Sequence, residues 1–392
     1  MIDLEKIRQD TPGCEKLIHF NNAGAALMPA EVAKAIHHYL ALEEYQGGYE
    51  TADRYCNELN DFYSYAAQLL NCQPRNIAFT TNATDGYNRA LSAIDFTPGD
   101  VVLLTDNDYP SNYIACLSLQ KRLGLRLVTI RTTTSGEVDL NDLDEKLRKY
   151  TPRLLSVSHV PTSSGLVQPA VQIGEIVSKY DTVYLLDACQ SLGQLEVDAI
   201  STQADFISGT FRKYLRGPRG AGLLYVSDKA LAQGLEPLFI DLHGATWMSA
   251  DQYISGKNAR RFEDWETSYA LMMGCKEALK YLISIGIRDI EARNAELIGK
   301  LKNALGKIGR IRLLDRGAQQ CSIVTFSIDG SKEATMQFYH DHSVNVYTIT
   351  KSSAVIDFQN KGIDWVVRVS PHYYNTESEI NRFAELTQMR VG

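Results

Sequence analysis

Apolar runs and amphipathic stretches alternate between residues 77 and 226. The apolar runs are short, and we predict seven strands from them, at residues 77–80, 101–105, 126–130, 154–159, 183–187, 206–208 and 222–226. Helical periodicity, in which apolar residues recur every three or four positions, lies between most of these runs, at residues 84–94, 112–123, 140–150 and 171–179. The alternation predicts an α/β fold with a mostly parallel seven-stranded sheet flanked by helices.

The pattern differs on either side of this region. Three helices are expected before it, at residues 1–15, 31–44 and 53–70. Residues 230–263 show no regular pattern. Helices are expected again at about 265–285, 290–305 and 377–388, with strands near 311–314, 322–328 and 365–369. We therefore predict a large domain of residues 16–263 and a smaller α+β domain built from residues 1–15 and 264–392.

Composition narrows the class of protein. The 392 residues carry a net charge of −7, which disfavours a nucleic-acid partner. No apolar run reaches the roughly 18–20 residues of a membrane span, and the N-terminus lacks the pattern of a signal peptide. The seven cysteines are irregularly spaced without a C-x-x-C pair, which favours reduced thiols over disulfides or a metal site. We therefore expect a cytoplasmic protein that binds neither membrane nor metal.

Two strand ends carry the residues that suggest the chemistry. The strand at 183–187 ends in Asp187, and Lys213 follows the strand at 206–208 within the sequence ISGTFRKYLRGPRG. A lysine at the end of a buried strand is partly desolvated, which lowers its pKa and frees the amine for Schiff-base chemistry. A loop lysine is more often solvated and idle, but the upstream carboxylate changes this balance. The two residues resemble the pair that binds pyridoxal phosphate (PLP) in fold-type I enzymes.

A phosphate site is predicted where the strand at 77–80 runs into a helix. Free backbone N–H groups and the positive end of the helix dipole favour an anion at such a turn. Thr84 would cap this helix or bind a phosphate oxygen. Ser208 and Thr210, just before Lys213, offer further hydroxyl groups for the same phosphate.

Other candidates follow neighbouring strands. Tyr109 would stack on a pyridine ring, although a plain turn tyrosine is the commoner interpretation. Thr162 and Gln190 carry groups that can hydrogen-bond the phenolic oxygen of such a ring. Arg368 lies in an apolar strand and therefore needs an anion, which is either a substrate carboxylate or an acidic residue of the chain.

In combination these segments are similar to the class V aminotransferase family of fold-type I PLP enzymes, which includes cysteine desulfurases and kynureninase. The similarity rests on the turn at 82–84, Tyr109, Thr162, D-A-C-Q at 187–190, S-G-T-F-R-K at 208–213 and R-V-S-P-H-Y-Y-N-T at 368–376. It implies the fold-type I architecture, a PLP cofactor, and a homodimer with the site at the subunit interface. Residues near 266–268 would then serve the neighbouring site.

The same resemblance implies a role for each candidate. Lys213 is the Schiff-base lysine, Asp187 pairs with the pyridine nitrogen and Gln190 binds the phenolic oxygen. The phosphate would be held by Ala83, Thr84, Ser208 and Thr210. Tyr109 would stack on the ring, and Arg368 with Asn22 would bind the α-carboxylate of an amino-acid substrate.

The chain departs from the desulfurases at two places. They carry S-G-H-K where this chain has S-G-T-F-R-K, and they carry a sulfur-accepting cysteine on the loop that corresponds to residues 348–362 here, which contains none. Cys321 is the nearest downstream cysteine and is expected in the core. The finer resemblance is to ergothioneine-type sulfoxide lyases and isopenicillin-N-epimerase-like proteins, through segments such as H-F-N-N-A-G at 19–24 and A-R-R-F-E-D-W-E at 259–266.

We therefore expect a C–S lyase that eliminates the sulfur group of an S-substituted cysteine, or its sulfoxide, and forms pyruvate and ammonia. Lys213 would take the Cα proton as general base. Trp247, Arg216 and Arg219 would line the leaving-group side, although loop packing explains them equally well. A class V aminotransferase is the first alternative, and a cysteine desulfurase or an amino-acid epimerase follows.

Overall fold

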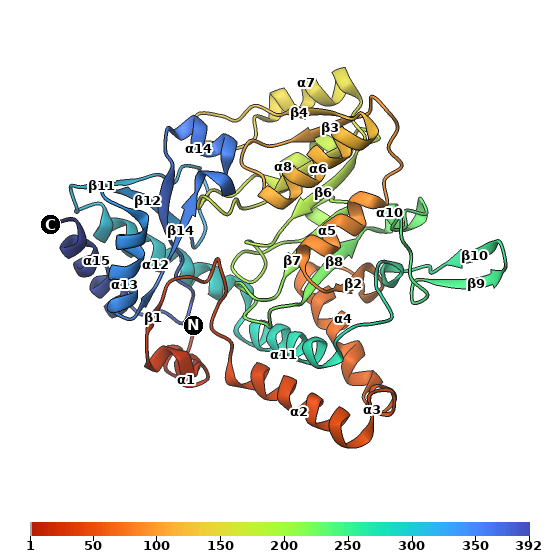
Figure 1. The fold of residues 1–392 in the computed structure, drawn as a ribbon, viewed down its shortest axis with the longest axis horizontal. Helices are drawn as coiled ribbons and strands as arrows, with labels where there is room; N and C mark the ends of the chain where they lie inside the picture. The colour runs from red at the N-terminus through yellow and green to blue at the C-terminus, as the bar shows by residue number, and fades with distance from the viewer. Residues whose placement is uncertain (1) are drawn as a thin grey trace.

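A seven-stranded sheet forms the centre of the computed structural model, which describes residues 2–392 (Figure 1). Its strand order is β2-β8-β7-β6-β5-β3-β4. All neighbours are parallel except β8, which runs antiparallel to both β2 and β7. The strands are β2 (Ile77–Thr80), β3 (Val101–Leu104), β4 (Arg126–Thr129), β5 (Leu154–Ser158), β6 (Val183–Asp187), β7 (Phe206–Thr210) and β8 (Gly222–Val226). The predicted mostly parallel seven-stranded sheet is confirmed.

Alternate residues of each strand pack into two different cores, as the two-residue period of a strand requires. Tyr184 and Leu186 of β6 join a cluster on one face, and Leu185 joins a cluster on the other. The first cluster is covered by α4 (Cys56–Leu70), α7 (Leu140–Tyr150), α8 (Ala170–Val177) and α11 (Tyr269–Ile285). The second is covered by α5 (Ala83–Ser92), α6 (Pro110–Leu123) and α10 (Asp228–Ala232). Helices therefore flank both faces of the sheet. Because both faces are buried, consecutive residues of most strands are apolar.

A smaller four-stranded sheet lies beside the large one, with strand order β11-β12-β15-β14 and antiparallel pairing throughout (Figure 1). Its strands are β11 (Ile311–Leu313), β12 (Val324–Ile328), β14 (Tyr347–Thr350) and β15 (Trp365–Val369). The helices α12 (Ile287–Leu305), α13 (Lys332–Asp341) and α15 (Glu377–Val391) contribute to its own apolar cluster. A short strand near the N-terminus, β1 (Ile18–His19), pairs with β13 (Val344–Asn345) of this part.

Packing crosses the predicted domain boundaries. The helix α11 packs against α4 and against α2 (Ala30–Gln46), and its Leu279 lies in the large cluster under the main sheet. Ile7 of α1 (Leu4–Gln9) belongs to the same cluster, whereas Phe20 belongs to the smaller one. The division into residues 16–263 against residues 1–15 and 264–392 therefore stays a prediction.

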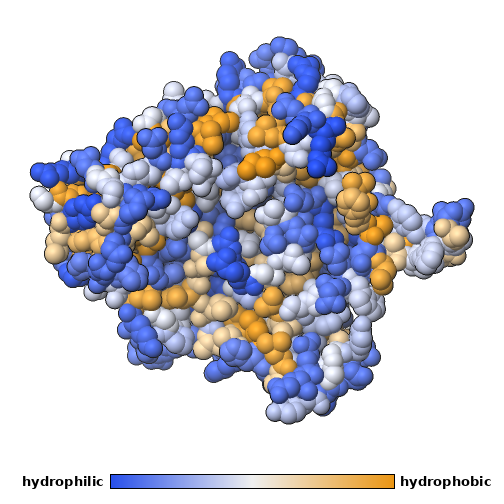
Figure 2. All heavy atoms as spheres, in the orientation of Figure 1, coloured by the Kyte–Doolittle hydropathy of each residue, from blue (hydrophilic) through white to orange (hydrophobic). Residues whose placement is uncertain are grey.

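Several elements were not anticipated from the sequence. The helix α10 begins at Asp228 and ends within residues 230–263, the segment without a regular pattern. The same segment contains a hairpin of β9 (Ala245–Ser249) and β10 (Gln252–Ser255), which projects from the body of the molecule (Figures 1 and 2). The helix expected from residue 265 begins at Tyr269, because Ser268 caps it by accepting from the backbone N–H of Leu271. The remaining short helices are α3 (Gly48–Arg54), α9 (Ala199–Thr202), α14 (Val355–Lys361) and the 3-10 turns Pro12–Glu15, Pro74–Asn76, Ala259–Phe262 and Lys351–Ser353. Across residues 2–392, no helix combines the length and the apolar character that crossing a membrane requires.

Candidate active site

Three parallel strands end side by side where the predicted site residues lie. In the register of β5, β6 and β7, Ser158 pairs with Asp187, and Asp187 pairs with Ser208. Ligands bind beyond the carboxyl ends of strands in open α/β sheets. The sheet therefore brings Asp187 and the residues that follow β7 to one edge.

Asp187 is buried and its carboxylate is held from two sides. Oδ2 accepts a hydrogen bond from Asn112 Nδ2 at 2.8 Å, and Oδ1 accepts from the backbone N–H of Cys189 at 2.9 Å. Only 5% of the residue is exposed. Each oxygen has a further lone pair, so this carboxylate is oriented and still able to accept a proton donor such as a pyridinium N–H.

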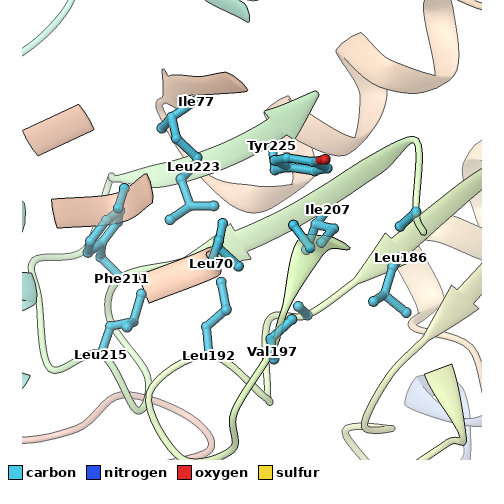
Figure 3. Packing of buried hydrophobic residues seen from close by; sticks show 14 of the residues in the cluster. Leu70, Ile77, Leu186, Leu192, Val197, Ile207, Phe211, Leu215, Leu223 and Tyr225 are labelled. Atoms are coloured by element: carbon cyan, nitrogen blue, oxygen red, sulfur yellow. The ribbon is translucent and has the colours of Figure 1, made fainter. Parts of the chain in front are cut away.

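The loop that carries Lys213 is fixed by its neighbours in the core. Phe211 and Leu215 lie two residues to either side and pack with Leu192 and Leu223 into the cluster beneath the sheet (Figure 3). A Cβ on Gly193 would lie 2.4 Å from the backbone of Tyr214, and Gly193 has φ +93°. Only glycine therefore permits the loop after β6 to approach the lysine loop this closely.

Lys213 is buried with 5% of its surface exposed. Burial lowers the pKa of its amine to about 8, and the charge of Arg212 acts in the same direction. Its Nζ lies 5.9 Å from the centre of the Tyr109 ring. Lys213 and Tyr109 both line the cavity described below, and the predicted stacking of Tyr109 on a ring stays a prediction.

The expected phosphate cup lies at the start of α5. Asn82 rather than Thr84 caps this helix, because the Asn82 side chain accepts from the backbone N–H of Asp85. Thr84 is half-buried, which leaves its hydroxyl available for the other predicted role, and Ala83 is buried. A Cβ on Gly222 would lie 2.8 Å from the nitrogen of Ala83, so glycine allows the helix start to approach β8 closely. The hydroxyls of Ser208 and Thr210 are buried nearby at the end of β7.

Gln190 and Thr162 contact each other at the same edge. Gln190 Nε2 donates to the carbonyl of Ala23 at 3.1 Å and approaches Thr162 Oγ1 at 3.4 Å. Gln190 Oε1 is buried without a partner in the part of the chain that the structure describes. Their predicted role toward a ring oxygen stays a prediction.

Arg368 points into the same region from β15. Its Nη1 donates to Thr162 Oγ1 at 2.8 Å and to the Thr162 carbonyl at 3.2 Å, and Nη2 donates to Asn21 Oδ1 at 3.3 Å. Its Nε is buried, and no acceptor within residues 2–392 reaches it. Burial lowers the pKa of this guanidinium to about 10. No carboxylate of the described residues pairs with it, so the salt-bridge interpretation left open by the sequence finds no partner in the chain.

Asn22, which the resemblance places beside Arg368, makes its hydrogen bonds with other residues. Its side chain is fully buried, donates to the backbone carbonyls of His19 and Ser370, and accepts from the hydroxyl of Tyr374 at 2.5 Å. The side chain next to Arg368 belongs instead to Asn21. Asn22 therefore makes its hydrogen bonds within the protein, and its predicted role beside Arg368 stays a prediction.

Arg216 and Trp247 also lie away from the site of their own chain. Arg216 is 1% exposed and its guanidinium is saturated by partners within the protein, namely Leu27 O, Tyr373 OH and Thr11 Oγ1. Trp247 lies on the projecting hairpin and is 80% exposed. The expectation that they line the leaving-group side is not met within one chain, whereas Arg219 does line the cavity described below.

Two buried polar residues behind Asp187 were missed at the sequence level. Asn112 bridges Asp187 to Asp108, whose Oδ1 it approaches at 3.5 Å. Ser158 Oγ donates to Asp108 Oδ1 at 2.5 Å, and burial raises the pKa of this second carboxyl to about 6. The sequence D-N-D-Y-P-S-N contained both residues, but only the fold shows that Asn112 faces Asp187.

A cavity of about 340 Å³ opens at this edge. It is lined by Asn21, Ala23, Gly24, Ala25, Tyr109, Pro110, Thr162, Arg212, Lys213, Arg219, Tyr347, Ile349, Ser353 and Arg368. Among the residues that the structure describes, Arg368 Nε of this lining is buried without a partner. Within residues 2–392, Gln190 Oε1, next to Thr162 of the lining, and the Oγ of Ser208, which pairs with Asp187 in the sheet, are also buried without partners. Buried polar groups are almost always hydrogen-bonded in folded proteins. The orphaned atoms therefore fit a site made for groups that the chain itself does not supply, and the donor set suits a phosphorylated pyridine and a carboxylate.

The loop that carries the acceptor cysteine in desulfurases forms an ordered helix here. Residues 355–361 form α14, which is tied to the body by Ser163 Oγ donating to Asp357 and by Asn360 Nδ2 donating to Asp106. Cys321 is buried in a separate apolar cluster, as expected, and burial raises the pKa of its thiol to about 12. Within the described residues, no group of His, Cys, Asp or Glu side chains is arranged to hold a metal ion.

Comparison with known proteins agrees with this geometry. The family model described as aminotransferase class-V matches residues 18–383. A probable cysteine desulfurase of Methanothermobacter thermautotrophicus is 26% identical over 99% of this chain and 98% of its own length. A probable cysteine desulfurase of Pyrococcus abyssi is also 26% identical, over 97% of this chain and 95% of its own. Neither relative carries the name of the sulfoxide-lyase branch, so that finer resemblance rests on the sequence segments alone.

Solved structures show the same fold. Cysteine desulfurase from Thermococcus onnurineus superposes with a TM-score of 0.92 at 24% identity, over 100% of this chain and 98% of the other. The cystine C-S lyase C-DES, solved with cysteine persulfide as its reaction product, superposes with a TM-score of 0.86 at 22% identity, over 96% and 99%. Another C-DES structure holds glycine covalently linked to PLP. The fold is therefore that of the fold-type I PLP enzymes.

Proposed function

Because the chain belongs to the class V aminotransferase family of PLP-dependent enzymes, we propose that it is a C–S lyase acting on a cysteine-type amino acid. The Cα–H bond and the Cβ–S bond break, and the sulfur group leaves as a thiol when the substrate is an S-substituted cysteine. Water then hydrolyses the remaining three-carbon unit to pyruvate and ammonia. Carbon, nitrogen and sulfur balance without an oxidant, a reductant or a second amino acid.

The residues of the cavity suit this reaction. Arg368 would bind the α-carboxylate with the donors that the chain leaves unpaired. PLP, when bound, supplies an electron-withdrawing ring that accepts the charge developing at Cα, and Asp187 would keep its ring nitrogen protonated. Lys213 would remove the Cα proton, because a pKa lowered to about 8 provides a fraction of neutral amine near neutral pH.

The observation that favours a lyase over a desulfurase is the missing sulfur acceptor. A desulfurase needs a reactive cysteine on the loop before the carboxylate-binding arginine, and the helix α14 occupies that loop here without one. Cys189 lies beside Lys213, but burial and the charge of Asp187 raise the pKa of its thiol well above the usual value. A thiol held protonated is a poor nucleophile. The names of the relatives keep the desulfurase reaction as the second candidate.

The test is a product analysis on a panel of cysteine, S-substituted cysteines and their sulfoxides. We expect equal amounts of pyruvate and ammonia without any keto acid, and no alanine. Alanine formed with protein-bound sulfur would establish the desulfurase, and turnover that requires an added keto acid would establish the aminotransferase. Loss of chirality without consumption of the substrate would establish the epimerase. Lys213→Ala is the control for background chemistry.

We also propose a homodimer with the site at the subunit interface. The segment around the projecting hairpin exposes large apolar side chains that one chain leaves uncovered, namely Leu238, Phe239, Leu242, Trp247, Met248, Tyr253 and Ile254. Burial of such side chains against a second copy would be favourable. Phe239→Glu is expected to shift the mass measured by light scattering toward the monomer, with Lys34→Glu on another surface as control.

A further inference from the structure

Basic side chains surround the cavity, and acidic ones are missing from it. Arg212, Lys213, Arg219 and Arg368 line it, whereas its lining within residues 2–392 includes no Asp or Glu. Like charges gathered in one partly buried space repel each other. A bound anionic ligand offsets this repulsion, so a cluster of cationic side chains in a cavity indicates a binding site for anions.

Two of these four cations have an assigned partner under the proposed function. Lys213 would bind the cofactor covalently, and Arg368 would bind the α-carboxylate. The residues predicted to hold the phosphate, Ala83, Thr84, Ser208 and Thr210, are not among those that line this cavity, so the prediction assigns the phosphate to neither of the other two. Arg212 and Arg219 are therefore left without an anion.

Arg212 lies on the substrate side of the cavity. Its Nη1 donates to the carbonyl of Gly24, in the same turn that brings Asn21 to Arg368. A backbone carbonyl neutralises no charge, and burial together with the nearby charge of Arg219 lowers the pKa of Arg212. Arg219 reaches the cavity from the exposed end of the loop, and no ion pair within the described chain involves it. The cavity thus holds two guanidinium groups in addition to the α-carboxylate anchor Arg368.

We propose that the preferred substrate carries a second anionic group on its sulfur substituent, held by Arg212 and Arg219. This inference rests on the proposed function and names its substrate class: cysteine conjugates whose leaving group bears a carboxylate or a comparable oxyanion. Arginine forks bind such groups bidentately, which gives strong preference over an uncharged isostere. Because Arg219 is exposed, its replacement leaves the fold intact.

The experiment compares S-carboxymethyl-L-cysteine with S-carbamoylmethyl-L-cysteine, its uncharged amide of nearly the same shape. The PLP-loaded enzyme is expected to turn over the carboxylate at least tenfold better in kcat/KM. Arg219→Gln should reduce that preference to within about threefold while turnover of the amide is kept, and Arg219→Lys should restore part of it. Arg368→Gln should weaken both compounds alike and serves as the matched control.

Binding is measured in parallel as the shift in melting temperature of the loaded wild-type enzyme and the loaded Arg219→Gln variant. A preference for the carboxylate in binding, without pyruvate formation, would support the second anion position and reject the lyase. Equal turnover of the two compounds by the wild-type enzyme would reject the second anion position and keep the lyase. Absence of both turnover and binding preference would reject both.

Discussion

Two buried arginines of this molecule, 152 positions apart in the chain, have opposite surroundings. Arg216 donates from all three of its nitrogens, to Leu27 O at 2.8 Å, Tyr373 OH at 2.7 Å and Thr11 Oγ1 at 2.6 Å. Arg368 is equally buried, yet its Nε finds no partner among the described residues. The first arginine holds the protein together, and the second is left for a ligand.

Their electrostatics show the same contrast. Aromatic rings surround the guanidinium of Arg216, which lies 4.6 Å from the ring centre of Tyr374 and 5.1 Å from that of Tyr373. Although burial alone would lower the pKa of Arg216, these tyrosines raise it overall. For Arg368, burial lowers the pKa to about 10. Burial alone therefore does not distinguish a structural arginine from a binding one, whereas unsatisfied donors do.

The largest expected effect is on folding and concerns Arg216. Arg216→Met removes the donor from three acceptors, of which Tyr373 OH and Thr11 Oγ1 are buried and Leu27 O is partly buried. Each unsatisfied buried group costs about 1–3 kcal/mol. We expect the free energy of unfolding of the cofactor-free protein to fall by about 4 kcal/mol or more, measured by urea denaturation. Arg219→Met, on the exposed part of the same loop, is the control and should change it by less than about 0.5 kcal/mol. A change of less than about 1 kcal/mol in the free energy of unfolding of Arg216→Met would show that Arg216 is not the structural arginine we infer.

Arg368→Met should reduce activity strongly without lowering stability, the reverse of what we expect for Arg216→Met. Loss of a charge pair in a secluded site costs about 2–5 kcal/mol, which is about 30-fold to 5,000-fold in kcat/KM for the amino-acid substrate. The stability of the cofactor-free protein should be unchanged or higher, because a desolvated cation without a carboxylate partner is removed. PLP should still bind with its normal absorption spectrum. Unfolding of this variant together with normal kinetics of its folded fraction would make Arg368 structural.

Lys213 is also buried, without an ion pair to a carboxylate of the described residues, and its effect on folding stability should depend on pH. Its pKa is about 8 in the folded protein against 10.5 as the ordinary value, so the unfolded chain binds more protons between these pH values. Stability of the cofactor-free protein therefore rises with pH across this window. Lys213→Met should be more stable than wild type by about 3 kcal/mol at pH 7. The gain should shrink from pH 8 upward and vanish above pH 10.5.

Urea denaturation at pH 7 and at pH 10 measures this difference. Lys34→Met, which removes an exposed lysine, is the control for the substitution itself. A constant difference between wild type and Lys213→Met at the two pH values would show that Lys213 is not held desolvated.

The smallest effect is expected at Thr162, which positions Arg368 through a 2.8 Å hydrogen bond to its Oγ1. Thr162→Val keeps the shape and removes this acceptor, at a cost of about 1 kcal/mol, or about fivefold in kcat/KM. The change should fall mainly on KM, measured with the best substrate of the panel. Thr162→Ser is the matched control and should retain most of the activity. A loss in Thr162→Ser without a loss in Thr162→Val would assign the effect to packing of the methyl group.

The residues at the strand ends of the site were predictable, because a polar residue that follows a buried apolar run lies at the edge of the sheet. Asp187, Tyr109 and Lys213 follow three such runs, and parallel strands bring their carboxyl ends to one edge. The central sheet was predictable because every strand except the edge strand β4 is buried on both faces and therefore appears as an apolar run.

Residues whose orientation depends on distant partners were not predictable. Asn21 and Asn22 are adjacent in the chain but have different partners. Asn22 accepts a hydrogen bond from the hydroxyl of Tyr374, about 350 residues away, whereas Asn21 accepts one from Arg368. Arg216 is buried and donates to residues distant in the chain, such as Leu27 and Tyr373, whereas Arg219 lines the cavity. Local sequence carries neither piece of information.

The measurement that tests the account most directly is borohydride reduction of the PLP-loaded enzyme followed by peptide mapping. Reduction fixes the cofactor to the amine that holds it. We expect one labelled peptide, with the pyridoxyl group on Lys213, and no label on that peptide when the reduction is omitted. Label on another lysine, or protein that stays colourless and unlabelled after incubation with PLP, would contradict the assignment of this cavity as the cofactor site.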